Sequence, residues 1–296
     1  MSIPKVQVPG ATTSLSRIAW GAGGVPSEAA HLLDVCVECG ITTMDCAEIY
    51  DDFKQEALLG ETLKLRPGLR DRLEIVTKCS VVTVTPEYPQ YTMYQYDTTK
   101  KHIIAAAESS LRKIGTDRLD ALLLHRWDPL MDADEVAEAF IHLQKSGKVL
   151  SFGVSNFAAP AMRLLASRLP FPLVTDQIEL SVLHTDPVYD GTLDYCQEMR
   201  MPPMIWSPLG GGKLFTGTDE RTQRVRGELA AIGEETGAPI NRVALAWVLM
   251  HPSRPIVILG THNEANLRSS AQAMDVPLTR EHWYRILNAS MGKRIP

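Results

Sequence analysis

Several features are missing from this chain of 296 residues, and each absence excludes a class of protein. The five cysteines are odd in number and their spacing forms no disulfide framework, as expected in a reducing compartment. The longest apolar run, Val243 to Met250, is too short to span a bilayer, and the first residues lack the apolar centre of a signal peptide. We therefore expect a soluble, cytoplasmic protein with no membrane partner.

A large excess of charge of one sign is also absent. The net charge is −5 and no basic run is present, so no nucleic-acid partner is expected. The eight histidines are scattered without paired ligand spacing. Cys36 and Cys39 have the spacing of a redox or zinc motif, but they lie in one predicted amphipathic helix with no second pair to complete a site. We interpret them as small buried hydrophobes and expect no metal.

A glycine-rich dinucleotide fingerprint is missing too. Gly21-Ala22-Gly23-Gly24 does not complete a G-x-G-x-x-G pattern, and no acidic ribose partner follows at the right distance. Tyr96 and Lys100 have the Tyr-x-x-x-Lys spacing of short-chain dehydrogenases. That chemistry needs both residues on one helix, whereas Asp97 or Thr98 is predicted to cap a helix here.

The sequence does contain short apolar runs that alternate with helix-length amphipathic segments. Most runs are apolar throughout, which is typical of strands buried on both faces. Eight such strands alternating with helices predict an α/β fold of the (β/α)8 TIM barrel type. The predicted strands are Arg17–Gly21, Ile41–Cys46, Leu73–Lys78, Ala121–His125, Phe152–Ser155, Val174–Ile178, Met204–Ser207 and Ile256–Leu259. The predicted helices are 27–39, 54–65, 99–114, 132–146, 159–168, 190–200 and 239–250.

Additional segments complete this predicted barrel. No linker or repeat divides the chain, so residues 1–296 are expected to form a single domain. A hydrophobic segment before Arg17 is predicted to form an N-terminal hairpin over the barrel floor, and extra C-terminal helices are predicted at 219–236 and 279–291.

Two long loops are expected to overhang the face where the strands end. They run over Val82–Thr98, which carries four tyrosines, and over Pro208–Asp219. Long loops in compact domains are often binding lids. For the first loop, the sequence equally allows a solvated loop whose tyrosines cover apolar surface.

Four polar residues lie at or just past the ends of predicted strands: Asp45, Tyr50, Lys78 and His125. In a parallel barrel these positions meet on one face, where barrels of this kind place their chemistry. A phenol, an ammonium, a carboxylate and an imidazole together can protonate a carbonyl oxygen while hydride arrives at its carbon.

Each of the four has a role in this hypothesis. Tyr50 would be the general acid, and the ammonium of Lys78 would make it a better proton donor because a nearby cation favours the phenolate. Asp45 would hold Lys78 in place, and His125 would hydrogen-bond the carbonyl oxygen. Taken singly, each could be an ordinary ion pair, surface aromatic or structural histidine; their common face favours the joint interpretation.

The segments around these residues resemble the aldo-keto reductase family. Matching pieces occur in the family's order from about Arg17 to about Arg268, and the order is more specific than any single piece. Leu150 stands where the family has an arginine. The matching segments include Met44–Tyr50, Glu56–Leu63, Ile75–Cys79, Leu119–His125, Gly147–Val149 and Phe152–Phe157.

The resemblance, to an uncharacterised bacterial oxidoreductase branch, implies NAD(P)H-dependent reduction of an aldehyde or ketone. It also implies where the cofactor would bind: strand-end amides and hydroxyls at the nicotinamide, Trp206 stacked on its ring, a glycine-rich run at the pyrophosphate and the last strand at the adenosine. The expected cofactor residues are Ser155, Asn156, Gln177, Trp206, Ser207, Pro208, Leu209, Gly210, Gly211, Gly212, Lys213, Gly260, Thr261, Asn263 and Asn266.

Cofactor choice is left open by two departures from the family. Members selective for NADPH commonly carry Lys or Arg at the positions aligned with Gly260 and Asn266, where the cation pairs with the 2′-phosphate. Thr261, His262, Asn263 and Arg268 are the candidates to compensate for the missing cations. The resemblance favours NADP(H), and the two replacements allow NAD(H) or dual use.

The substrate is expected to be a small-molecule carbonyl compound held beside the strand ends by Trp20, Ala22, Val81, Arg126 and Trp127. Arg126 would either attract an anionic substrate or pair with Asp128. Two other functions remain as alternatives: a non-catalytic nicotinamide-binding regulatory subunit, and an aldolase that forms a Schiff base on Lys78. Either a monomer or a simple homo-oligomer is compatible with the sequence.

Overall fold

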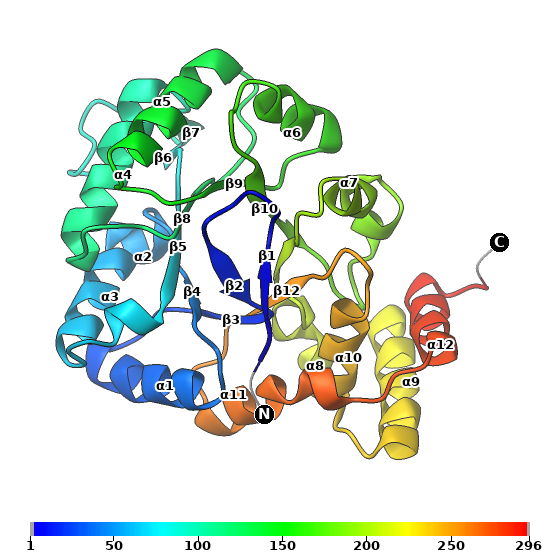
Figure 1. Cartoon of the computed structure of the whole chain (residues 1–296). Helices are drawn as coiled ribbons and strands as arrows, with labels where there is room; N and C mark the ends of the chain where they lie inside the picture. Colours follow the sequence, from blue (N-terminus) through cyan, green and yellow to red (C-terminus); the bar gives the residue numbers. More distant parts are fainter. Residues whose placement is uncertain (1–2, 295–296) are drawn as a thin grey trace.

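Eight parallel strands close into a barrel in the computed structural model, which describes residues 3–294 (Figure 1). The order around the barrel is β10-β11-β12-β3-β4-β5-β8-β9. The predicted (β/α)8 fold is therefore confirmed, and each predicted strand end lies within two residues of the observed one. The strands are β3 (Ile18–Gly21), β4 (Thr43–Asp45), β5 (Glu74–Cys79), β8 (Ala121–Leu124), β9 (Phe152–Ser155), β10 (Leu173–Glu179), β11 (Met204–Trp206) and β12 (Ile256–Leu259).

Helices surround the barrel and bury one face each against it (Figure 1). They are α1 (Pro26–Glu38), α3 (Gln55–Lys64), α4 (Lys100–Ile114), α5 (Ala133–Lys145), α6 (Ala159–Ala166), α7 (Thr192–Glu198), α10 (Ile240–Leu249) and α11 (Glu264–Ala271). None of the helices within residues 3–294 combines the length and the apolar character needed to cross a membrane.

The two predicted extra helices are α9 (Glu220–Thr236) and α12 (Arg280–Met291), which pack against each other beside α10 (Figure 1). Trp283 of α12 stacks on Trp247 of α10 with ring centroids 5.0 Å apart, and this contact holds the C-terminal segment to the barrel. Helix α11 was missed by the sequence interpretation because only Leu267 and Ser270 of its eight residues are buried. So short and polar a segment carries little helical periodicity.

The predicted N-terminal hairpin is present as β1 (Lys5–Gln7) paired antiparallel with β2 (Ser14–Ser16), and it lies across the centre of the barrel in Figure 1. It contacts the beginnings of barrel strands. Ser16 Oγ accepts from the backbone N–H of Thr43 at 3.0 Å. Arg17, just after the hairpin, donates to the carbonyls of Pro255 at 2.7 Å and Leu249 at 2.8 Å. The hairpin therefore covers the floor of the barrel.

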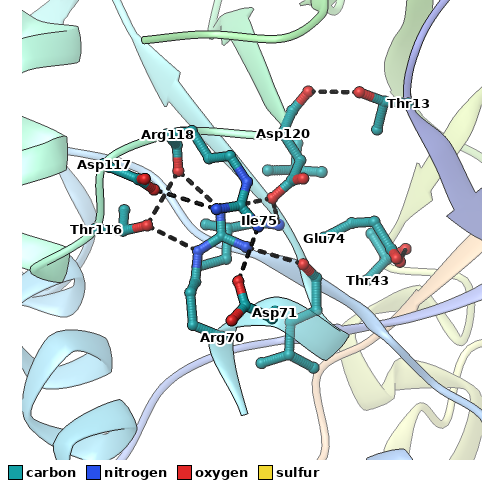
Figure 2. Close-up of polar contacts among 12 residues, drawn as sticks. Thr13, Thr43, Arg70, Asp71, Glu74, Ile75, Thr116, Asp117, Arg118 and Asp120 are labelled. Carbon is teal, nitrogen blue, oxygen red and sulfur yellow. Dashed lines mark hydrogen bonds and ion pairs between the residues drawn. The ribbon is translucent and has the colours of Figure 1, made fainter. Parts of the chain in front are cut away.

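A polar cluster on the floor joins the starts of β5 and β8, as Figure 2 shows. Arg70 donates to Oδ2 of Asp120 at 2.8 Å and to the carbonyl of Arg118 at 2.7 Å. The same carboxylate oxygen accepts from Ile75 N–H at 2.9 Å, and the backbone carbonyl of Asp120 accepts from Thr13 Oγ1 at 3.0 Å. This end of the barrel has satisfied groups that hold strands together, as expected for the face opposite the chemistry.

The segment Val82–Thr98 is more ordered than a plain loop. Its ends pair as a short antiparallel ladder, β6 (Val81–Val82) with β7 (Gln95–Tyr96). Helix α4 is capped by Thr99, one or two residues later than the sequence indicated, because Asp97 instead accepts from Thr99 N–H at 2.9 Å. We call the stretch from 82 to 98 the tyrosine loop.

Candidate active site

The structure brings the four predicted catalytic candidates together at the carboxyl ends of β4, β5 and β8. Lys78 is completely buried, and its Nζ donates to both carboxylate oxygens of Asp45, at 2.8 and 2.9 Å. A third bond runs from Nζ to the carbonyl of Cys46 at 2.8 Å. All three N–H donors of the ammonium are thus used, so its position is fixed by the protein.

Tyr50 lies between the ammonium and the imidazole. Lys78 Nζ is 4.8 Å from the centroid of the Tyr50 ring. The His125 ring centroid is 5.4 Å from the same ring, at an interplanar angle of 80°. The phenol is half-buried, so it is both enclosed by these groups and open to the solvent side.

The charges of this group follow from burial. Burial by itself lowers the pKa of Lys78, but the charges of Asp45 and Tyr50 and the hydrogen bonds to Asp45 outweigh it and raise the pKa. Lys78 is therefore a cation at neutral pH. Burial, followed by the charges of Lys78 and Arg126, lowers the pKa of His125 to about 2, so its imidazole is neutral. The ring has a proton on only one nitrogen, which suits it to donate to a neutral oxygen.

A left-handed turn follows Tyr50 directly. Asp51, Asp52 and Phe53, within the short element α2 (Tyr50–Phe53), have φ values of 51°, 53° and 67°. Three successive non-glycine residues in this region are strained, by about 1–2 kcal/mol each. Two contacts hold the turn: the ring of Phe53 is buried, and the backbone carbonyl of Phe53 accepts from Lys113 Nζ at 3.2 Å. Nothing in the sequence, which carries no glycine here, indicated this turn.

We expect the double substitution Asp51→Gly and Asp52→Gly to raise the free energy of unfolding by about 1 kcal/mol, since both side chains are exposed and glycine adopts positive φ without strain. Urea denaturation measures the change. Ala105→Gly, at an exposed position inside α4, is the control and should lower stability by about 1 kcal/mol. A loss of stability in the double variant would show that the aspartate side chains, and not the strain, decide the energy of the turn.

A cavity of about 590 Å³ opens between the ends of β11 and β12. Gly211 and Gly212 have positive φ, and a Cβ at Gly212 or Gly260 would meet nothing within 4 Å, so backbone is open to a ligand along this wall. Of the predicted cofactor residues, those on the wall are Trp206, Ser207, Pro208, Leu209, Gly211, Gly212, Gly260, Thr261 and Asn266. The sequence interpretation missed Phe215, Asn241, Ile258 and Ser270.

Six predicted cofactor residues do not line this cavity: Ser155, Asn156, Gln177, Gly210, Lys213 and Asn263. Gly210 faces Leu183, whose Cδ1 lies 3.1 Å from the position of an added Cβ. The ammonium of Lys213 lies 3.3 Å from a carboxylate oxygen of Asp219 on the surface. Asn263 caps α11 by accepting from the N–H of Asn266.

The predicted nicotinamide residues form one hydrogen-bonded chain that leads to the catalytic candidates. Trp206 Nε1 donates to Asn156 Oδ1 at 3.1 Å, and Asn156 Nδ2 donates to Ser155 Oγ at 2.8 Å. Ser155 Oγ in turn donates to the carbonyl of Gln177 at 2.8 Å. The side chain of Gln177 donates to Asp45 Oδ1, also at 2.8 Å. These hydrogen bonds connect the ends of β9, β10 and β11 to the Asp45–Lys78 pair.

Asp176 is a buried carboxyl beneath this chain that the sequence interpretation missed. Oδ1 accepts from the N–H of Phe157 at 3.4 Å, whereas Oδ2 has no partner in the part of the chain that the structure describes. Burial raises the pKa of Asp176 to about 8, with a further rise from Asp190. No signal in the sequence marked it, because Asp176 stands between two other polar residues, Thr175 and Gln177, in the predicted strand Val174–Ile178.

The predicted substrate residues differ in accessibility. Trp20, Ala22 and Val81 are almost completely buried, while Arg126 is half-exposed and Trp127 is 47% exposed. The alternative in which Arg126 pairs with Asp128 is not seen. That carboxylate instead accepts from Thr98 Oγ1 at 2.7 Å and from Leu130 N–H at 2.9 Å.

A closed (β/α)8 barrel with a buried Asp–Lys pair beside a tyrosine and a histidine, next to a glycine-lined groove, defines the aldo-keto reductase class. The profile of the Aldo/keto reductase family matches residues 17–290, and the chain belongs to that family. Its members are oxidoreductases that use nicotinamide cofactors, as the resemblance of the sequence segments implied.

The relatives agree with this assignment. The chain is 48% identical over 261 residues to oxidoreductase YdhF of Escherichia coli, which covers 88% of this chain and 86% of the relative. It is 44% identical over 288 residues to a 6-dehydroglucose reductase of Agrobacterium fabrum, covering 95% and 96%. The solved structure of a glycerol dehydrogenase from Gluconobacter oxydans has the same fold, with a TM-score of 0.86 at 22% identity over 100% and 98% of the two chains.

Proposed function

We propose that this chain, working as a single domain over residues 1–296, reduces the carbonyl group of a small aldehyde or ketone with Tyr50 as general acid and base. The observation that carries the proposal is the buried ammonium of Lys78, fixed by Asp45 and placed 4.8 Å from the Tyr50 ring centroid. A cation held there favours negative charge on the phenol oxygen, which is what a proton donor needs as it releases its proton.

Each residue has one task in this reaction. When bound, a reduced nicotinamide supplies hydride for the carbonyl carbon. The Tyr50 hydroxyl gives its proton to the carbonyl oxygen, and in the reverse direction takes the proton of the alcohol. Neutral His125 donates a hydrogen bond to the same oxygen, and Asp45 keeps Lys78 charged and in place.

The residues of the groove fit a dinucleotide cofactor. Trp206 offers a ring at the end of β11, and open backbone at Gly211, Gly212 and Gly260 suits the close approach of a phosphate-bearing chain. Within residues 3–294, no group of three or more His, Cys, Asp or Glu side chains is arranged to hold a metal ion.

The Schiff-base alternative is disfavoured by the state of Lys78. A nucleophilic amine must be neutral, and enzymes that use one lower the lysine pKa. Here the pKa of Lys78 is raised, and its ammonium donates to Asp45 and Cys46 with all three hydrogens. For the regulatory alternative, binding of a nicotinamide nucleotide without turnover would be the decisive result.

The experiment that tests the proposal is a titration of the purified protein with NADPH and with NADH, followed by quenching of tryptophan fluorescence, and then a panel of carbonyl compounds. The panel includes 6-dehydroglucose, because a relative that is 44% identical is named for its reduction. Carbonyl-dependent oxidation of the nucleotide is the expected result. Binding without turnover on any carbonyl compound would favour the regulatory alternative, and no binding would contradict the proposed groove.

We further propose that the enzyme discriminates weakly between NADPH and NADH. Arg268 is the positively charged residue nearest in sequence to the residues predicted to bind the adenosine. Its guanidinium donates to Glu264 and to Glu38, each at 2.8 Å. His262 packs against the ring of Trp20 with centroids 5.8 Å apart. Asn266 lines the groove without charge. A 2′-phosphate would thus lack a dedicated cation, which is the usual source of NADPH selectivity.

Asn266→Arg is expected to raise the ratio of kcat/KM for NADPH over NADH by about 10–100-fold, because one charge-assisted hydrogen bond to phosphate is worth roughly 1.5–3 kcal/mol. Steady-state kinetics with both nucleotides measures the ratio. Gln197→Arg adds the same charge at an exposed position of α7 and should leave the ratio unchanged. A wild-type enzyme that already prefers NADPH by more than about a hundredfold would overturn the idea of weak discrimination.

A further inference from the structure

Four buried polar side chains with an unpartnered atom gather in one place outside the four catalytic candidates. Of the described residues, Glu48 Oε1, Glu56 Oε2, Ser80 Oγ and His102 Nε2 are among the few buried atoms without a hydrogen-bond partner. These residues surround the turn that carries Tyr50, where α3 and α4 meet the ends of β4 and β5. Unpaired buried polar atoms are costly, so such a concentration calls for an explanation.

Glu48 and His102 face each other at the centre of this cluster. Both are at least 95% buried, and His102 Nε2 lies 3.5 Å from Glu48 Oε1. On the other side of the imidazole, Nδ1 lies 3.3 Å from the hydroxyl oxygen of Tyr91. The Tyr91 O–H donates to Asp97, which leaves its oxygen to accept from His102 Nδ1–H.

One proton must therefore lie between Glu48 and His102. Asp97 is ionised, because hydrogen bonds from Tyr91 and Thr99 outweigh its burial and lower its pKa. With a hydrogen on Nδ1, the remaining nitrogen either carries a hydrogen directed at the Glu48 carboxylate or accepts one from the carboxylic acid. Burial raises the pKa of Glu48, which makes the second arrangement available. In both arrangements the pair is neutral overall, and one proton lies in the 3.5 Å gap between Glu48 Oε1 and His102 Nε2.

This pair holds the catalytic turn from both sides. Glu48 is two residues before Tyr50, and its N–H donates to the carbonyl of Lys78 at 3.0 Å. Phe53 is three residues after Tyr50, and its ring packs on Tyr88 with centroids 5.8 Å apart. Tyr88 also packs on His102 at 5.4 Å and donates to Glu48 Oε2 at 3.4 Å.

We propose that the Glu48–His102 pair is a positioning unit that sets the place of Tyr50 and couples it to the tyrosine loop. Through Tyr88, Tyr91 and Asp97 the pair fastens the inner side of the loop, while Val84, Met93 and Tyr94 on its outer side are more than half exposed. The exposed side is then free to meet a substrate without disturbing the general acid. This proposal rests on the proposed function, because it assigns Tyr50 the proton transfer.

The test compares four variants of the full chain. Glu48→Gln keeps an acceptor for Tyr88 and supplies an N–H to His102, so it should retain most of kcat. Glu48→Leu and His102→Phe each leave the other group unpaired and are expected to lower kcat by about 10–100-fold through displacement of Tyr50. The dissociation constants of NADPH and NADH should not change, because the groove lies at β11 and β12.

The double variant Glu48→Leu, His102→Phe separates positioning from stability. It leaves neither group unpaired, so it should recover part of the lost melting temperature, while kcat stays low. Recovery of kcat together with stability, or wild-type kcat in both single variants, would overturn the proposal. Glu235→Leu is the matched control: it breaks a second carboxylate–imidazole contact, 3.0 Å from His282 between α9 and α12, and should leave kcat unchanged.

Hydrogen exchange gives a readout that requires no turnover. Amides in 48–53 and in the tyrosine loop should exchange faster together in Glu48→Leu and in His102→Phe, and at wild-type rates in Glu48→Gln. If only one of the two segments changes, the coupling is refuted. This measurement decides the positioning proposal even if no carbonyl substrate is found and the proposed function fails.

Discussion

Replacing Tyr50 by Phe is expected to lower kcat for carbonyl reduction by about 10²–10⁴-fold, the usual contribution of a positioned general acid. The phenyl ring preserves the contacts with Lys78 and His125 and removes only the hydroxyl that donates the proton. The fold and the cofactor groove should therefore be unaffected. Steady-state kinetics, with nucleotide dissociation constants from tryptophan quenching, separates the loss of turnover from any loss of binding.

The control for this substitution is Tyr189→Phe. Tyr189 is exposed and lies far along the sequence from the four candidates, so the loss of its hydroxyl should leave kcat unchanged. A Tyr50→Phe enzyme with more than about a tenth of the wild-type kcat would exclude Tyr50 as the main proton donor. His125, the remaining neutral donor beside the ring, would then be the first candidate to replace it.

Asp45→Asn is expected to destabilise the protein by about 3–5 kcal/mol at neutral pH, because it leaves the ammonium of Lys78 buried without a counter-charge. The pH dependence should change as well. In the wild type the raised pKa of Lys78 gives stability that is fully present below about pH 10 and is lost above it. In the variant, the charge and hydrogen bonds of Asp45 no longer oppose burial, which lowers the lysine pKa, so stability should increase as pH rises from 6 to 9.

The matched variant is Asp45→Asn combined with Lys78→Met, which removes the buried charge and keeps a side chain of similar length. Urea denaturation should show that it regains most of the stability lost in Asp45→Asn, whereas activity stays low because the cation beside Tyr50 is gone. Equal destabilisation of the single and double variants would mean that Gln177, which also donates to Asp45, and not the charge of Lys78, accounts for the effect.

The fold and the four catalytic candidates were predictable from the sequence for a simple reason. Buried parallel strands are short apolar runs, and the residue after such a run lies on the catalytic face whatever surrounds it. This rule alone was sufficient to predict that Asp45, Lys78 and His125 lie on the catalytic face. Tyr50 was predicted on the same face, but the left-handed turn that presents it was not, because this turn depends on the burial of Phe53, a contact made across the fold.

The features that were missed depend on contacts between distant segments. The pairing of Glu48 with His102 joins a strand-end loop to α4, and no local pattern marks either residue as buried. The β6–β7 ladder consists of two pairs of residues separated by a long irregular segment, too little to give a period of two. The sequence also could not show which predicted cofactor residues line the groove, because this depends on side-chain partners. Lys213, for example, pairs with Asp219.

The contacts of the N-terminal hairpin determine when the barrel can close during synthesis. Arg17 precedes its acceptors, the carbonyls of Leu249 and Pro255, by 232 and 238 residues. At the usual 5–20 residues per second, its guanidinium waits roughly 10–50 s for them. Strand β12, which pairs with β3 to close the barrel, begins directly after Pro255, so the barrel closes only after the acceptors of Arg17 have been translated.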